Sequence, residues 1–251
     1  MEDPFPDRSP RFRNDDVDWD RWPVGDYLSE NYRRLHRADA SVIDHHSAFY
    51  AQFPADSIAR SVELGAGPNL YPLMLAAAAC RRIEAVERSA ANVAYLRSQL
   101  DDGPDETWLP FYTRCRRHNP ALPPTAAQAL ARVHVVRSDA RSVPPDTYDL
   151  ASMNFVAESI TENGPEFAEV CRAFVRSVRP GGHLVAAFME NMGRYQLGDG
   201  SHWPGYPVDE ARIRQVFAPH LATIAVTRID ADPALPDYGY SGMVLLAGRR
   251  R

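Results

Sequence analysis

The stretch Val62-Glu63-Leu64-Gly65-Ala66-Gly67-Pro68-Asn69-Leu70 decides the fold of this chain. An apolar run that ends in Gly-x-Gly can turn sharply and let its backbone approach a ligand closely, because a side chain at either glycine would block the approach. The next apolar run ends at Glu87, twenty residues after Gly67. An acidic residue at that place can accept both hydroxyls of a ribose. The pattern predicts a pocket for a nucleoside at the ends of two neighbouring strands.

The same turn argues against a dinucleotide. A dinucleotide site also uses a third glycine for close helix packing and a bare helix N-terminus for pyrophosphate. Here Leu70 takes the place of that glycine, and Pro68-Asn69 stand in the turn. We therefore expect an adenosine ligand without phosphates.

Further motifs surround the glycine turn. They are Asp26-Tyr27-Leu28 with Asn31-Tyr32, Gly65-Ala66-Gly67-Pro68-x-x-Tyr71, Glu87-Arg88-Ser89-x-x-Asn92, Ser138-Asp139-Ala140 and Arg179-Pro180-Gly181-Gly182-His183-Leu184. Together they resemble class I S-adenosylmethionine (SAM) dependent methyltransferases. The first four are more narrowly similar to motifs of the small-molecule N-methyltransferases that act on nicotinamide, phenylethanolamine and indolethylamine. The resemblance spans roughly residues 26 to 190 and carries Glu87 where the family has Asp.

This resemblance implies SAM as the cofactor and S-adenosylhomocysteine as its product. It implies that Tyr27 and Tyr32 close over the cofactor and that Asp139 lies at its adenine side. The residues expected to bind the cofactor are Tyr32, Glu63, Gly65, Ala66, Gly67, Asn69, Tyr71, Glu87, Arg88, Asn92, Asp139, Ala140, Asn154 and Phe155.

Alternating apolar runs predict an α/β fold, a Rossmann-like class I methyltransferase with a seven-stranded, mostly parallel sheet, helices on both faces and an N-terminal helical lid. We expect one domain over residues 1–251, with an arm and lid at 1–55, a core at 56–251 and an inserted cap near 101–132. Residues 1–18 are expected to be disordered or loosely draped. The expected strands are 59–64, 82–87, 133–137, 148–154, 183–189, 221–229 and 242–248, and the expected helices are 69–79, 89–100, 165–178 and 208–217.

Composition excludes several functions. The 251 residues contain no lysine, so neither a lysine Schiff base nor a Walker phosphate loop can form. The net charge of −5 is unsuited to gripping a phosphate backbone, and we expect no nucleic-acid partner. The segment Ser152-Met153-Asn154-Phe155 also lacks the Pro-Pro-aromatic element with which exocyclic base amines are methylated.

Three widely spaced cysteines, Cys80, Cys115 and Cys171, give neither a disulfide framework nor a metal-ligand spacing, and we expect a cytoplasmic protein without a metal. No run is apolar and long enough to predict a signal peptide or a membrane helix. We expect a small-molecule acceptor as the partner, and a monomer or a homodimer.

Methyl transfer to an amine needs a carboxylate that holds the amine and takes its proton. Glu158 and Glu190, just past two expected strands, are the candidates, with Tyr27 as a further catalytic residue. Glu158 could equally cap the following helix. Phe188 stands where nicotinamide enzymes carry a substrate-contacting acid, so the acceptor need not be a pyridine or a catecholamine.

For two other groups of side chains, the sequence allows either a functional or a purely structural role. The pair His45-His46 is expected to be half-exposed rather than a ligand pair, because adjacent residues point to different faces of a helix. The aromatic residues that could either form a box at the substrate end or simply pack are Trp203, Tyr206, Tyr238 and Tyr240.

The sequence thus favours N-methylation of a small amine or N-heterocycle in bacterial metabolism. Two alternatives stay open. One is an enzyme that uses SAM differently, by aminobutyrate transfer or cyclisation, and the other is a SAM-binding protein without catalysis.

Overall fold

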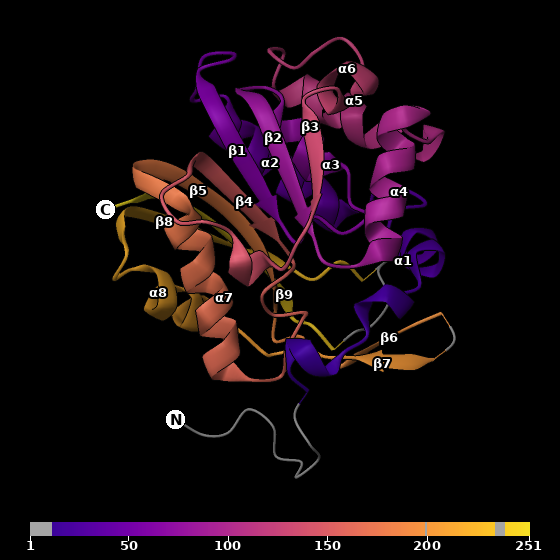
Figure 1. Cartoon of the computed structure of the whole chain (residues 1–251), viewed down its shortest axis with the longest axis vertical. Coiled ribbons are helices and arrows are strands. Elements are labelled where there is room, and N and C mark those ends of the chain that lie inside the picture. The colour runs from indigo at the N-terminus through magenta and orange to yellow at the C-terminus, as the bar shows by residue number, and fades with distance from the viewer. Residues whose placement is uncertain (1–11, 199, 234–238) are drawn as a thin grey trace.

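A twisted sheet forms the centre of the molecule (Figure 1). The computed structural model describes residues 12–198, 200–233 and 239–251. The seven strands lie in the order β3-β2-β1-β4-β5-β9-β8; β1 to β5 pair in parallel, and β9 runs antiparallel to both β5 and β8. Their bounds are β1 Ile58–Leu64, β2 Cys80–Glu87, β3 Val133–Arg137, β4 Tyr148–Asn154, β5 Val178–Glu190, β8 Leu221–Asp230 and β9 Gly242–Arg250. The expected fold class is confirmed.

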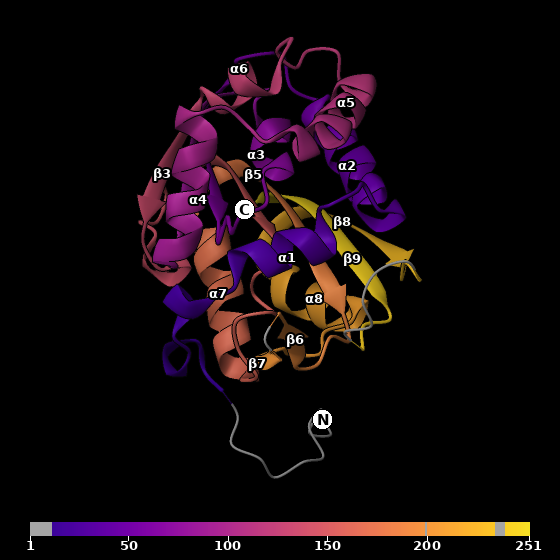
Figure 2. The ribbon, with the colours of Figure 1, turned by 90° about the vertical axis from the view of Figure 1, so that its right-hand side faces the viewer.

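Helices cover both faces of this sheet (Figures 1 and 2). Side chains alternate along β5, so Val185 and Ala187 join one apolar cluster while Leu184 and Ala186 join the other. The first cluster packs under α2, α3, α4 and α5, and the second packs under α7 and α8. The helices are α1 Val24–Asn31, α2 Arg37–Tyr50, α3 Tyr71–Ala76, α4 Ala90–Asp101, α5 Leu109–His118, α6 Ala126–Leu130, α7 Gly164–Ser177 and α8 Glu210–Phe217.

Strand order places the ligand crevice. The chain leaves β1 toward β2 on one side, and β4 later pairs on the other side of β1. At such a reversal the loops after adjacent strands diverge and leave a crevice outside the carboxyl ends of the strands. The glycine turn follows β1 directly, so it lies at this crevice.

The insertion between α4 and β3 contains η3 (Glu106–Trp108), α5 and α6. Trp108 and Phe111 are buried in the cluster under α2 and α3. None of residues 101–132, all of which are described, lines the pocket treated below. This segment therefore covers a face of the sheet, and it packs against Tyr32 through Trp108, whose ring centroid lies 5.3 Å from that of Tyr32.

The N-terminal arm is more ordered than the sequence suggested. Residues 1–11 of the segment expected to be loose lie outside the described residues, but 12–22 form two short turns, η1 (Asn14–Asp16) and η2 (Trp19–Arg21). Asn14 is 3% exposed and its backbone N–H donates to Glu166 at 3.0 Å. The expectation of a draped arm is wrong for this part, because buried polar bonds fix it to the core.

A small hairpin of β6 (Tyr195–Leu197) and β7 (Ser201–Trp203) follows β5 and was not predicted, since two strands of this length carry too short a pattern. α1 lies across the molecule above this hairpin (Figure 2). Within the described ranges, no helix is long and apolar enough to cross a membrane.

Candidate active site

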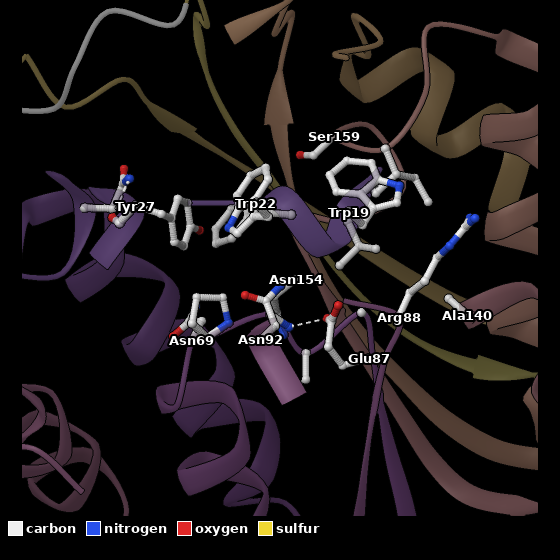
Figure 3. Close-up of a pocket in the computed structure, with 18 of the residues that line it drawn as sticks. Trp19, Trp22, Tyr27, Asn69, Glu87, Arg88, Asn92, Ala140, Asn154 and Ser159 are labelled. Carbon is white, nitrogen blue, oxygen red and sulfur yellow. Dashed lines mark hydrogen bonds between the residues drawn. The ribbon is translucent and has the colours of Figure 1, made fainter. Parts of the chain in front are cut away.

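A pocket opens at the carboxyl ends of β1, β2, β4 and β5, roofed by the N-terminal arm and α1 (Figure 3). Gly65 has φ 64° and Gly67 has φ 55°, the left-handed region that favours glycine. A Cβ atom on Gly65 would lie 2.5 Å from Cγ1 of Val156. Backbone conformation and space therefore both require glycine at position 65, whereas position 67 requires it for conformation alone.

Glu87 closes β2 beside this turn. Its carboxylate accepts the backbone N–H groups of Gly67 at 2.8 Å and Ser89 at 2.7 Å, and the side chain of Asn92 lies near it in the pocket (Figure 3). Burial raises the pKa of Glu87, and these donors counteract the rise. The acceptor is thereby fixed in orientation before any ligand arrives, which suits a bidentate partner such as a ribose diol.

The neighbouring end of the pocket is a charge network. Arg141 donates to both oxygens of Asp139, and Arg88 reaches the same carboxylate at 3.2 Å. Asn14 of the arm donates its side-chain N–H to Asp139 at 3.2 Å. Burial works against the charge of Asp139, but the Arg141 bonds outweigh it and the net pKa is lowered. Asp139 is ionised and already well supplied with donors, and Arg88 is held by Asp15 as well.

The predicted pair of lid tyrosines meets at the opposite end. The hydroxyl oxygens of Tyr27 and Tyr32 lie 3.3 Å apart, and Asn69 donates to Tyr32 at 3.1 Å. Burial raises the pKa of Tyr27 to about 12, so its hydroxyl stays protonated at neutral pH. Both tyrosines line the pocket.

An aromatic wall continues from Tyr27 along the roof. The ring centroids of Trp22 and Tyr27 are 5.4 Å apart, those of Trp22 and Trp203 4.9 Å, and those of Trp19 and Trp203 5.5 Å. Trp19 and Trp22 face the pocket and were not predicted, because they lie between the segment expected to be loose, 1–18, and the first motif, which begins at Asp26. Trp203 packs against both of these rings but does not itself line the pocket.

The other three aromatic residues considered for a box at the substrate end do not line the pocket where the structure describes them. Tyr206 stacks on Phe167 in the core, with ring centroids 5.3 Å apart. The hydroxyl of Tyr240 donates to the backbone of Asp232 at 3.4 Å. Tyr238 lies outside the described residues.

Below the pocket floor, a chain of hydrogen bonds fixes Asn154. Asn154 donates to Glu63 at 3.0 Å, and the ring of His46 bonds its side-chain oxygen at 2.9 Å. Burial lowers the pKa of His46 to about 3, so this ring is neutral. The expectation of a half-exposed histidine pair is wrong for His46, which is 1% exposed because it lies on the buried face of α2. Glu63 does not line the pocket and acts through Asn154.

The two predicted catalytic carboxylates do not line the pocket either. Glu158 is fully buried, accepts the backbone N–H of Met189 at 2.7 Å, and has a pKa raised to about 8 by burial. Glu190 is held by two bonds from Arg228 at 2.9 and 2.8 Å and by Ser241 at 2.7 Å. Burial opposes its charge, yet these bonds keep its pKa lowered. In this geometry, both residues brace strand ends, and their catalytic role stays a prediction.

Asp39 is the pocket carboxyl that the sequence analysis missed. It stands in the first turn of α2, is 5% exposed, and lines the pocket; burial raises its pKa to about 7. A signal existed, because Asp39 shares helical spacing with the buried residues Val42, Ile43 and His46. A carboxylate on the apolar stripe of a helix indicates a buried charge that needs a partner.

The structure therefore gathers most of the predicted cofactor residues in one pocket, together with Tyr27, which was predicted to be catalytic. Those that line the pocket are Tyr27, Tyr32, Gly65, Ala66, Gly67, Asn69, Glu87, Arg88, Asn92, Asp139, Ala140, Asn154 and Phe155. Tyr71 lies behind Asp39 and is fully buried. The missed residues include the arm residues Asn14, Trp19 and Trp22, the helix residue Asp39, and the apolar side chains of Met189, Met192 and Met243.

Solved structures support the fold. The [4+2]-cyclase SpnF matches with 16% identity and a TM-score of 0.59 over 96% of this chain and 98% of that one. A possible histamine N-methyltransferase of Thermotoga maritima matches with 14% identity and a TM-score of 0.54, over 93% and 98% of the two chains. The N-methyltransferase NodS of Bradyrhizobium japonicum matches with 11% identity and a TM-score of 0.52, over 84% and 97%.

No curated protein sequence shows a significant match to this chain. At the identities of the solved structures, likeness shows the fold alone. The family model is more specific, since it matches residues 14–250 and so includes the arm, the glycine turn and the antiparallel end of the sheet. The chain belongs to the NNMT/PNMT/TEMT family of SAM-dependent methyltransferases.

Proposed function

We propose that this protein binds SAM in the pocket and transfers its methyl group to the nitrogen of a small amine or N-heterocycle. One observation carries the proposal: a pocket with a preorganised ribose acceptor at one end, Glu87, continues into an apolar and aromatic end that holds a single unpaired carboxyl, Asp39. The ribose of the methyl donor would bind Glu87 at one end, and a cationic nitrogen of the acceptor would bind Asp39 at the other.

The residues that line the pocket fit SAM. Glu87 and Asn92 would hold the ribose, Asp139 and Ala140 would flank the adenine, and the glycine turn would let the amino-acid end pass close to the backbone. When bound, SAM supplies an activated methyl group, and the chain need only position the acceptor and exclude water. The aromatic wall and Tyr27 would perform that exclusion.

Two further expectations belong to the same proposal. Residues 1–55 would act as the lid of a single catalytic domain, since the arm and α1 form the pocket roof. The protein would work in the cytoplasm as a monomer or a homodimer, which suits three buried free cysteines.

Calorimetry and labelled turnover test the proposal. We expect SAM and S-adenosylhomocysteine to bind at micromolar concentration, and we expect trideuteromethyl-SAM to label an amine in a panel of small acceptors, read by mass spectrometry. Release of methylthioadenosine without a labelled acceptor would instead favour aminobutyrate transfer. Tight binding without turnover over the panel would favour a non-catalytic protein, and absence of any SAM binding would refute the proposal.

A further inference from the structure

Three carboxyl groups line the pocket, and one of them has no counter-charge. The carboxylate of Glu87 accepts hydrogen bonds from backbone N–H groups, and the carboxylate of Asp139 forms ion pairs with two arginines. Among the described residues, no arginine or histidine pairs with Asp39, although it is as buried as Glu87 and more buried than Asp139. A buried carboxylate without a cation is unfavourable unless a partner arrives from outside the chain.

A polar group beside Asp39, the hydroxyl of Tyr71, lacks a well-formed hydrogen bond. The hydroxyl of Tyr71 is close enough to weaken the burial effect on the pKa of Asp39, yet this hydroxyl makes no hydrogen bond of acceptable geometry. Tyr71 is fully buried. Buried hydroxyl groups without a partner are rare, so this pair indicates a place for a ligand group that can donate.

The position of Asp39 separates it from the nucleoside end. Asp232, which follows β8, accepts the backbone N–H of Arg37 at 2.8 Å at the start of α2. The start of α2 is thereby tied to the β8–β9 side of the sheet. Glu87 ends β2, which lies beyond β1, β4 and β5 in the strand order. Asp39 and Glu87 consequently face different parts of the pocket.

The β5–β9 side of the pocket is lined by apolar side chains. Met189, next to the last residue of β5, pairs with Met243, the second residue of β9, and both line the pocket. The aromatic wall of Trp19, Trp22 and Tyr27 closes the roof. Aromatic faces attract cations, and apolar side chains accept a hydrocarbon body. The ligand class that fits is an amine, cationic at neutral pH, on an apolar or aromatic skeleton.

We propose that Asp39 binds the protonated amine of the methyl acceptor and takes its proton before transfer. This inference rests on the proposed function. The ammonium proton passes to the Asp39 carboxylate, and the freed nitrogen lone pair forms the new N–C bond as the C–S bond of SAM breaks. The products are a methylated ammonium ion and S-adenosylhomocysteine, and Asp39 later releases one proton to solvent.

The protonation behaviour of Asp39 agrees with this role. Its pKa of about 7 places the group near the working pH, where a general base is most effective. The titratable groups that face it are the hydroxyls of Tyr27, Tyr32 and Tyr71, whose pKa values burial raises, and the carboxyl of Asp232. None of the tyrosines titrates between pH 6 and 8.

The first experiment measures binding without turnover. Calorimetry on the S-adenosylhomocysteine complex would compare benzylamine, phenethylamine and hexylamine with the alcohols of the same skeletons. We expect an amine to bind better than its alcohol, and Asp39→Asn to weaken amine binding at least about tenfold, equivalent to roughly 1.4 kcal/mol. Asp44→Asn is the matched control, since Asp44 lies on the same helix but pairs with Arg114 outside the pocket. No preference for amines, or equal loss in both variants, overturns the proposal.

SAM affinity separates the alternatives. If Asp39 held the ammonium of the cofactor, Asp39→Asn would weaken SAM and leave amines unaffected, which overturns the proposal. Amine binding that depends on Asp39, without methyl transfer from SAM, would refute the proposed function and the proton step but retain the amine site. With turnover, kcat/KM of Asp39→Asn should fall about 100-fold or more.

A variant-free measurement covers the case in which Asp39→Asn does not fold. In the unaltered protein, amine affinity should rise between pH 6 and 8 as Asp39 loses its proton, while affinity for the matched alcohol stays level. A level amine curve would overturn the proposal.

Discussion

The two ends of the pocket differ in how their carboxylates are satisfied. At the nucleoside end, Glu87 and Asp139 receive donors from the backbone, from arginines and from the arm. At the other end, Asp39 has no counter-charge among the described residues, and the hydroxyl of Tyr71 beside it makes no hydrogen bond within normal geometry. The difference teaches that one end is complete before its ligand binds, whereas the other end lacks a cation that a ligand can bring.

Glu158→Gln should produce the largest effect, on stability. Burial raises the pKa of Glu158 from 4.5 to about 8, so the folded state holds a proton that the unfolded chain loses across this window. The native state binds more protons, and stability therefore falls as pH rises from about 4.5 to 8. Each pKa unit corresponds to about 1.4 kcal/mol. Urea unfolding should find Glu158→Gln a few kcal/mol more stable than the parent at pH 8.5, with a smaller gain at pH 5.

Glu190→Gln is the matched control for this contrast. The pKa of Glu190 is lowered, because its hydrogen bonds from Arg228 and Ser241 exceed the cost of burial. Its contribution is present above the unfolded pKa and is lost as pH falls through the folded one. This variant should lose stability at neutral pH. The same pH profile for both variants would contradict the assignment of different environments.

Glu87→Ala should have the next largest effect, on cofactor affinity. It removes an acceptor that Gly67 and Ser89 hold in place, and charge-assisted bonds are worth roughly 1.5 to 3 kcal/mol each. SAM affinity by calorimetry should fall at least about tenfold. Glu190→Gln, outside the pocket, should leave that affinity unchanged. An unaltered dissociation constant in folded Glu87→Ala would place the ribose acceptor elsewhere.

Asn14→Ala should have a smaller effect at the same end. Its side chain joins the arm to Asp139 at 3.2 Å and accepts the indole N–H of Trp19 at 2.8 Å. The bond to Trp19 is neutral and worth about 0.5 to 1.5 kcal/mol, and Arg88 and Arg141 still bind Asp139 when the Asn14 bond is lost, so SAM binding should weaken only about three- to tenfold. Tryptophan fluorescence should report a looser arm. Arg13→Ala, an exposed neighbour, provides the comparison, and identical behaviour of the two variants would show that the arm does not organise this end.

Tyr27→Phe should have the smallest effect. It removes a hydroxyl contact of 3.3 Å with Tyr32 but keeps the ring packed against Trp22. We expect turnover to slow severalfold with little change in melting temperature. SAM with acceptor should also protect residues 20–40 from hydrogen exchange. Full activity of this variant, with equal exchange in free and bound protein, would mean that the segment is only a packed helix.

The sequence predicted best those parts of the site that depend on residues close together along the chain. The spacing of Gly65 and Gly67 predicts a turn with left-handed backbone conformations, and the position of Glu87 predicts an acid at the end of the next strand. Both features can be predicted from residues that are close in the sequence. The strand pattern determined the sheet, because each strand alternates its faces independently of the others. Of the thirteen expected residues that line the pocket, all but Tyr27 and Tyr32 lie at or shortly after the ends of β1, β2, β3 and β4, because parallel strands bring their carboxyl ends to one edge.

Tertiary structure alone decided the environment of each charge. Glu158 and Glu190 follow strands in the same way, yet one is buried without a cation and the other is paired with Arg228, which comes from β8 far along the chain. Asp39 became a pocket residue only because α2 packs beside β9, and Asn14 only because the arm folds back on Asp139. Burial and partners from distant segments set a pKa, and neither can be determined from the residues next to a carboxylate in the sequence.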